Sequence, residues 1–469
     1  MERKLRAVVC GLGKMGRAIV FSMENFGFHV VALDKDPDSA ANMPFELFDF
    51  LVTPDEEAMQ KAITLSNPDV VISSLPYHQN EKLAQFCIQR GYNYCDLGGR
   101  VDISKKINHF AMQVSGDVGG HCFTDLGLAP GWVNILAEHG IKQLYGRSND
   151  IEEVKMMVGG LPQFPDNPPL NYSLSWSLDG LLNEYKDDCA ILKNGKEISV
   201  KGMDGLEEVT TESLGELEAF YTSGGASHSI ESMKERGVEH CSYKTLRYKG
   251  HGELIKFLIR QCKLDEDCLS RVFEPYDGRK PIQDLVIIKV MVKAKESSWE
   301  KELLIPHGKA LSAMQKGTAF SIASVAKMMA EKFFDKNAPE HRDYRDLPPR
   351  ALTYKNVDYE EFMRNINILR ESPAVMDLPY EETDSKKMAR APHPQTQPTP
   401  SPSLAKKAFE EGKYEEAIKH LEGDLSKERE KDEPNEAKIG TILRDIEYLR
   451  EHFPQTPSTD GTPPPTPLS

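Results

Sequence analysis

The chain has 469 residues, of which 39% are hydrophobic and 28% charged, and its formal net charge at pH 7 is −15. This composition is typical of a globular protein of two or three domains, and the negative charge disfavours nonspecific nucleic-acid binding. No apolar run reaches the roughly 20 residues of a membrane span, no signal-peptide core follows the N-terminus, and no Cys-x-x-Cys pair occurs among eight cysteines. We therefore expect a cytoplasmic protein with reduced thiols and without a nucleic-acid or membrane partner.

Short apolar segments alternate with helical segments from the N-terminus to about residue 126. The predicted strands lie at 6–10, 28–34, 69–75, 92–96 and 121–125. The predicted helices between them lie at 16–26, 55–65, 80–90 and 103–114. Apolar strands that alternate with helices are typical of a parallel sheet covered on both faces. We therefore predict the α/β fold class, with a doubly wound Rossmann domain over residues 1–127.

The pattern changes after residue 127. A helix is predicted to begin within 129–137, with Pro130 near its first turn, and a second one covers 178–186. The predicted strands of this region are 153–158, 170–177, 196–200, 243–248 and 285–293. We predict an inserted α+β domain over residues 128–315 that binds substrate and, through its mixed sheet, forms a homodimer.

The C-terminal part is predicted to contain four segments. Residues 316–380 return to complete the Rossmann domain, and their apolar helix at 319–330 is suited to burial against a sheet. A proline-rich linker covers 381–403, a helical hairpin 404–453, and a disordered proline-rich tail 454–469. The hairpin resembles a tetratricopeptide unit and is interpreted as a packing or oligomerisation appendage, or alternatively as a module that recruits a protein partner.

A glycine turn lies between the first predicted strand and helix. It reads Gly11-Leu12-Gly13-Lys14-Met15-Gly16, and the acidic residue Asp34 ends the next strand. In this setting the glycines permit a tight turn, close approach of backbone to a pyrophosphate, and close packing of helix on strand. The helix N-terminus supplies N–H groups to the phosphates. The pattern predicts a nicotinamide dinucleotide.

Charged residues near the turn indicate whether the site prefers NAD or NADP. Asp34 is suited to accept hydrogen bonds from the adenosine ribose and to repel a 2′-phosphate, which favours NAD, while the neighbouring Lys35 leaves NADP open. Ser74, Leu75 and Pro76 end another strand and are predicted to pass close to the nicotinamide. We expect no metal, because no His, Asp or Glu cluster has ligand spacing.

Titratable side chains also gather where the predicted strands end. Tyr77 and His78 follow the strand at 69–75, Asp96 ends the strand at 92–96, and Asp125 ends the strand at 121–125. Because ligands of a doubly wound sheet bind at the carboxyl ends of its strands, these four residues are the predicted catalytic groups. Each has an alternative role: Asp96 and Asp125 as loop or helix caps, and His78 as a surface residue.

The same loops resemble the saccharopine dehydrogenase family. The similar segments are Ser-Ser-Leu-Pro-Tyr at 73–77, Tyr-Cys-Asp-Leu-Gly-Gly at 94–99, 125–137, Val-Gly-Gly-Leu-Pro at 158–162, 175–182 and 245–253. They occur in the family's order over about residues 5–370. Within the family, the acidic residue at position 34 and the compact chain are most similar to the lysine 6-dehydrogenase branch.

The resemblance implies oxidation at a carbon that bears an amine, or the reverse reductive amination. Such a reaction needs a group that takes a proton from the amine, a role for which Asp96 and Asp125 are the candidates, with Tyr77 and His78 as proton shuttles. Arg247 is the candidate for binding a substrate carboxylate, with His251 beside it, and Trp176 for lining the pocket. A surface salt bridge for Arg247 and a packing role for Trp176 are the alternatives.

We therefore predict an NAD(P)-dependent amine or amino-acid dehydrogenase that acts on lysine or a lysine-derived amine. Saccharopine reductase and carboxynorspermidine synthase activities are alternatives within the family. An alternative of another class is a catalytically idle NAD-binding scaffold whose C-terminal hairpin binds a partner.

Overall fold

The computed structural model divides the chain into two compact units, residues 1–389 and 390–469. The residues that it describes are 3–40, 49–114, 120–145, 151–164, 169–172, 174–273, 283–336, 351–372, 375, 419, 422–423 and 426–427. The predicted linker, nearly all of the hairpin, and the tail therefore lie outside the described residues.

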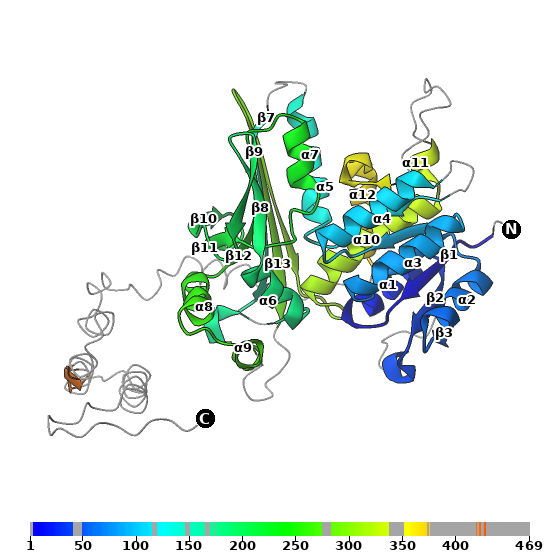
Figure 1. Ribbon diagram of the computed structural model, residues 1–469, viewed down its shortest axis with the longest axis horizontal. Helices are drawn as coiled ribbons and strands as arrows, with labels where there is room; N and C mark the ends of the chain where they lie inside the picture. Colours follow the sequence, from blue (N-terminus) through cyan, green and yellow to red (C-terminus); the bar gives the residue numbers. More distant parts are fainter. Residues whose placement is uncertain are drawn as a thin grey trace, which may run out of the picture. The chain divides into compact units, whose positions relative to one another are not determined.

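A seven-stranded parallel sheet, ordered β15-β6-β5-β4-β1-β2-β3, forms the first layer of the larger unit (Figure 1). Its strands are β1 (Arg6–Cys10), β2 (His29–Asp34), β3 (Asp49–Val52), β4 (Val70–Ser73), β5 (Asn93–Asp96), β6 (Cys122–Phe123) and β15 (Ala351–Leu352). The helices that connect them are α1 (Lys14–Asn25), α2 (Glu56–Ser66), α3 (Tyr77–Gln89) and α4 (Val101–Gln113). The central strands are buried along their length because helices cover both faces. The predicted Rossmann fold is confirmed.

An eight-stranded mixed sheet forms the second domain (Figure 1). Its strands are β7 (Ile151–Pro162), β8 (Asp188–Lys193), β9 (Lys196–Lys201), β10 (Glu207–Thr211), β11 (Gly215–Tyr221), β12 (His240–Arg247), β13 (Asp284–Ala294) and β14 (Ser298–Pro306). Its helices are α5 (Trp132–Tyr145), α6 (Leu178–Lys186), α7 (Ser229–Glu235), α8 (His251–Arg260) and α9 (Glu266–Phe273). The strand β12 runs parallel to β7, whereas β13 runs antiparallel to it. The predicted α+β character is therefore present.

The strand predicted at 170–177 is wrong. A short 3-10 turn (Pro169–Asn171) begins this segment, and the described residues after it form no strand before α6. Leu170 and Asn171 have φ angles of +59° and +52°, in the left-handed region, where an extended strand cannot continue. The apolar residues of the segment instead pack beneath α6 and α8.

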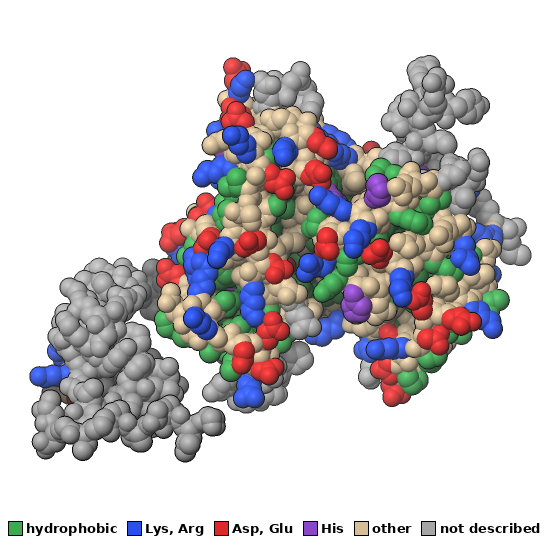
Figure 2. Space-filling view, viewed as in Figure 1, with side chains coloured by type: hydrophobic (Ala, Val, Ile, Leu, Met, Phe, Trp, Pro, Cys, Tyr) green, Lys and Arg blue, Asp and Glu red, His purple; other side chains and the backbone are tan. Residues whose placement is uncertain are grey.

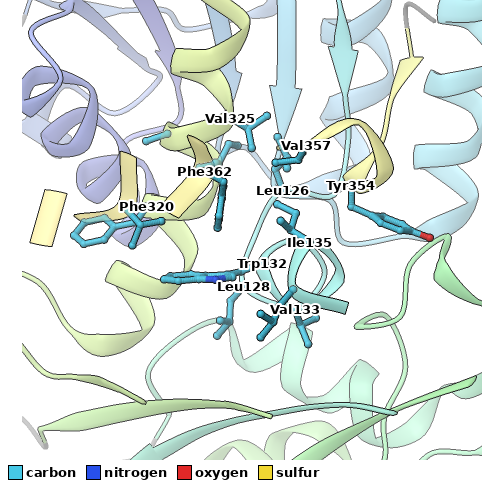
Figure 3. Packing of buried hydrophobic residues seen from close by; sticks show 14 of the residues in the cluster. Leu126, Leu128, Trp132, Val133, Ile135, Phe320, Val325, Tyr354, Val357 and Phe362 are labelled. Carbon is cyan, nitrogen blue, oxygen red and sulfur yellow. The ribbon is translucent and has the colours of Figure 1, made fainter. Parts of the chain in front are cut away.

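The long helix α10 (Ala313–Ala330) joins the two domains, since it contacts β4 and β5 of the first sheet and β13 and β14 of the second. Ser312 and Gln315 form a capping box at its start. Almost every residue of α10 is buried, as expected for a helix that is apolar all round. The helices α11 (Phe333–Lys336) and α12 (Tyr359–Arg370) follow it. Figure 3 shows the core at this junction, where the Trp132 ring meets Phe362 edge-on at a centroid distance of 5.7 Å.

Acidic and basic side chains are interspersed on the face of the molecule shown in Figure 2. None of the helices that the structure describes combines the length and the apolar character that crossing a membrane requires.

Candidate active site

A cavity of about 1460 Å³ is lined by both domains. The Rossmann domain contributes the glycine turn, the ends of β2 and β4, and the segments at 97–102 and 125–130. The second domain contributes residues of α6, β12 and the segment at 222–227. A ligand that binds at the carboxyl ends of the parallel strands therefore lies against side chains of the second domain.

The glycine turn fits a dinucleotide. Gly11 has a φ of +92°, and a Cβ on Gly16 would lie 1.9 Å from the Gly11 carbonyl oxygen, so both positions require glycine. The cavity is lined by Gly13, Lys14 and Met15. Gly16 instead packs closely against the Gly11 carbonyl oxygen within the turn. No side chain caps the N-terminus of α1, whose first N–H groups are suited to bind phosphate.

The Asp34 carboxylate stabilises the glycine turn by a hydrogen bond. Its Oδ2 accepts a hydrogen bond from the Leu12 N–H at 2.5 Å, and its Oδ1 accepts one from the Asp36 N–H at 2.9 Å. Asp34 and Lys35 both line the cavity. A carboxylate has further acceptor positions, so the contacts with the turn leave room for a ribose hydroxyl.

The segment from Ser74 to His78 follows β4 and lines the cavity with all five of its residues. Tyr77 is the first residue of α3, and its ring meets the His78 ring edge-on at a centroid distance of 5.8 Å. Tyr77 is 37% exposed and belongs to the cavity lining.

Asp125 lines the cavity on a buried, left-handed backbone with a φ of +65°. Its Oδ1 accepts a hydrogen bond from Ser104 Oγ in α4 at 2.7 Å. Its Oδ2 accepts one from Ser227 Oγ at 2.5 Å and lies 3.2 Å from Nε2 of His228. Because Ser227 and His228 precede α7, the Asp125 carboxylate connects the two domains at the cavity wall. Neither Ser227 nor His228 was predicted, since nothing local in the sequence relates them to Asp125.

Asp96 is placed differently. It is 1% exposed and is not among the cavity-lining residues that the structure describes. Its Oδ1 accepts hydrogen bonds from the N–H groups of Gly98 and Asp125, and its Oδ2 accepts one from the Tyr94 hydroxyl. Burial, reinforced by the Asp125 charge, raises the pKa of Asp96 to about 7. These contacts are those of a loop cap, the alternative role that the sequence left open, and they fix the backbone of Asp125.

Arg247 lines the cavity from β12 and is only 3% exposed. Its Nε donates to the Tyr185 hydroxyl at 3.1 Å and its Nη1 to the Leu246 carbonyl at 2.9 Å. The guanidinium lies over the Tyr172 ring, 4.5 Å from its centroid. This burial excludes the surface salt bridge considered for Arg247 in the sequence.

His251 stabilises Arg247 indirectly, through the Tyr185 hydroxyl. It is not a cavity-lining residue in the described part of the chain. Its Nδ1 lies 3.0 Å from the Leu170 carbonyl, which can only accept, so Nδ1 carries the proton and Nε2 accepts from the Tyr185 hydroxyl at 2.9 Å. Burial and the Arg247 charge lower the pKa of His251 to about 3. His251 reaches Arg247 through the Tyr185 hydroxyl, and its role in substrate binding stays a prediction.

Two further side chains complete this wall. Trp176 lines the cavity, and its Nε1 donates to the Tyr172 hydroxyl at 3.3 Å. Glu184 in α6 also lines the cavity, and burial raises its pKa to about 8. Glu184 was not predicted from the sequence, although it shares a predicted helix with other charged residues, because its inward orientation depends on the packing of α6. No group of His, Cys, Asp and Glu in the described residues is arranged to hold a metal ion.

Two family models match the chain over most of these elements. Residues 7–115 match the saccharopine dehydrogenase NADP binding domain, and residues 127–342 match the saccharopine dehydrogenase C-terminal domain. The first match confirms the predicted class of cofactor, a nicotinamide dinucleotide.

Curated relatives agree with these models. A saccharopine dehydrogenase (NADP(+), L-glutamate-forming) of Schizosaccharomyces pombe is 27% identical over 53% of this chain and 54% of its own length. The mitochondrial alpha-aminoadipic semialdehyde synthase of Rattus norvegicus is 25% identical over 64% of this chain and 33% of its own length. The chain thus spans about half the length of the first relative and a third of the second.

Among solved structures, the apo saccharopine dehydrogenase (L-Glu forming) of Saccharomyces cerevisiae is similar to this chain with a TM-score of 0.58. The match covers 79% of this chain and 98% of that one at 16% sequence identity, so it concerns the fold alone.

Proposed function

Because the chain belongs to the saccharopine dehydrogenase family, we propose that it is a nicotinamide-dependent oxidoreductase acting on the CH–NH group of lysine or a lysine-derived amine. The observation that carries this proposal is the single cavity lined by the glycine turn, by Asp125 and by the buried cation Arg247. One dinucleotide and one amino acid fit such an arrangement of groups.

The bound cofactor supplies the acceptor for a hydride, and the protein residues must prepare the amine. An alkylamine is protonated near neutral pH, and hydride leaves only from a carbon whose amine is neutral. Asp125 faces the cavity where the strands end, so we assign it the role of anchoring the amine and taking its proton. Its three neighbours, Ser104, Ser227 and His228, fix the direction in which its oxygens point.

The remaining predicted residues receive positioning roles. Tyr77 and His78 line the cavity at the start of α3 and remain candidates for orienting the amine or carrying protons. Arg247 is assigned to a substrate carboxylate, because its guanidinium is buried, charged and open to the cavity. Asp96, held in hydrogen bonds to two N–H groups, positions Asp125.

We further propose NAD as the preferred cofactor. Asp34 borders the cavity at the end of β2 and pairs with Val52 of β3, and Asp55 and Glu56, which follow β3, also line the cavity. A 2′-phosphate would meet these carboxylates, with Lys35 as a nearby cation. The matched family model and the relative from Schizosaccharomyces pombe are named for NADP, so this preference distinguishes the chain from them.

A substrate panel tests the proposed function. L-lysine, saccharopine, ornithine and carboxynorspermidine are each supplied with NAD and with NADP at alkaline pH, and formation of reduced nicotinamide is followed by its absorbance. We expect turnover with lysine or saccharopine. Binding of NADH without turnover of any of the four amines would contradict the proposal and favour a binding protein.

A further inference from the structure

Glu184 is a cavity-lining carboxyl to which the proposed reaction gives no role. It lies on α6, one residue before Tyr185, the residue that holds Arg247. Among the described residues its carboxylate has neither a hydrogen-bond partner nor an ion-pair partner, although its backbone carbonyl accepts from the Ser223 N–H. A half-buried carboxyl without a partner is costly in a folded protein. Such a group is commonly retained for a ligand.

Arg247 likewise has a hydrogen-bond donor without a partner among the described residues. Its Nε and Nη1 bind Tyr185 and the Leu246 carbonyl, while Nη2 makes no hydrogen bond to the described residues. The guanidinium rests on the Tyr172 ring, which fixes its plane. The remaining N–H donors of Arg247 are therefore available to a ligand that binds in the cavity.

The two groups are near one another but do not form an ion pair with each other. The charge of Arg247 lowers the pKa of Glu184, while the larger effect of burial raises it to about 8. An added cation beside Glu184 would favour its charged form and remove part of the cost of burial. Opposite charges held apart on one wall are complementary to a zwitterion.

We propose that Glu184 and Arg247 form a subsite for the α-amino-acid head group of the substrate. Arg247 binds the α-carboxylate and Glu184 accepts hydrogen bonds from the α-ammonium group. The inference rests on the proposed function and deepens it, because it names the part of the substrate that the second domain recognises. The contacts of Arg247 and those of Asp125 share no residue.

This division of contacts has a chemical consequence. If the α-amine is held by Glu184, the carbon that loses hydride bears a different amine, and Asp125 anchors that amine. The substrate class is then an α-amino acid that carries a second amine on its side chain. An amino acid without a distal amine would bind at the head-group subsite and not react.

The test uses the full chain with Glu184→Gln, which keeps the size of the side chain and removes its charge. L-lysine is compared with ε-aminocaproate, which has the carboxylate and the distal amine but lacks the α-amine. We expect KM for lysine to rise about 10- to 100-fold, with KM for ε-aminocaproate and kcat for both changed less than about twofold. The control is Asp187→Asn, an exposed carboxyl of the same cavity immediately after α6, for which we expect no change.

Two results would overturn the inference: an equal loss for both substrates in Glu184→Gln, or no loss for either. Thermal unfolding of each variant separates a folding defect from a binding defect. Should the wild type oxidise no amine at all, the proposed function fails first, and calorimetric titration of lysine into the NADH complex tests the subsite alone. Lysine must then bind the wild type more tightly than Glu184→Gln, and equal binding or none would refute the subsite.

Discussion

The two walls of the cavity are built by different means. The Rossmann wall is shaped largely by backbone, because the glycine turn and the uncapped start of α1 present N–H groups there. The wall of the second domain is shaped by buried side chains, in which Arg247 is held by Tyr185, and Tyr185 by His251. A site formed by backbone groups is suited to a cofactor that stays the same. The substrate specificity of a site formed by side chains can instead be changed by single substitutions.

The comparison also explains the position of Asp125. It belongs to the Rossmann domain by sequence, yet its carboxylate is held by Ser104 of that domain and by Ser227 and His228 of the other. We therefore expect substitutions there to affect catalysis more than substitutions within either wall.

Asp125→Asn should have the largest effect. It removes the charge that anchors the amine and the group that takes its proton, so kcat should fall about 100- to 10,000-fold. NADH affinity should stay within about twofold of wild type. The matched control is Asp96→Asn, a buried carboxyl outside the described cavity lining, which should lose less than about tenfold in kcat. Equal losses in the two variants would show that Asp125 acts only as a structural residue.

Gly16→Ala should come next and should impair the Rossmann wall alone. The new Cβ has no space beside the Gly11 carbonyl, so we expect a loss of unfolding free energy of about 1–3 kcal/mol and a fall in NADH affinity of about 100-fold. Gly13→Ala is the control, because a Cβ there meets no atom within 4 Å. It should retain wild-type stability in urea unfolding and lose only affinity for the cofactor, measured by NADH fluorescence.

Tyr185→Phe should impair the other wall. Loss of the hydroxyl leaves Nε of Arg247 and Nε2 of His251 without their hydrogen bonds, and we expect KM for the amine to rise about tenfold at nearly constant kcat. Tyr172→Phe keeps the ring beneath Arg247 and should change KM much less. A fall in kcat with unchanged KM would place Arg247 outside the substrate contacts.

Asp34→Ala should alter cofactor choice with a smaller effect. The ratio of kcat/KM for NAD to that for NADP should fall about tenfold, because a carboxylate that repels the 2′-phosphate is removed. Asp36→Asn, an exposed carboxyl outside the described cavity lining, serves as the control. If the ratio is unchanged in Asp34→Ala, our assignment of Asp34 is incorrect.

The last prediction concerns stability alone. The pKa of Asp96 is raised by burial to about 7, so its contribution to stability is present at low pH and is lost as the pH rises through about 7. Asp96→Asn cannot ionise, and the difference in unfolding free energy between about pH 5 and about pH 8 should shrink by at most about 3 kcal/mol. Urea unfolding at the two pH values measures this, and an unchanged difference would mean that Asp96 ionises freely.

The sequence predicted the backbone wall more completely than the side-chain wall, for which it indicated Arg247 and Trp176 but not Glu184. The glycine turn, Asp34 and the loop after β4 are contiguous segments whose local pattern determines their geometry. The segment at 170–177 has the apolar pattern of a strand, but the left-handed Leu170 and Asn171 turn it beneath α6 and α8. Glu184 carries no local signal, because its orientation follows from how α6 packs in the second domain.

The central claim is that one cavity presents the distal amine of an amino acid to the cofactor while the second domain holds its head group. The most direct measurement uses lysine deuterated either at the carbon bearing the distal amine or at the carbon bearing the carboxylate, with the reduced nicotinamide analysed by mass spectrometry. We predict deuterium in the cofactor only from the distal position. Deuterium from the carbon that bears the carboxylate, or turnover of lysine without transfer from either position, would contradict the account.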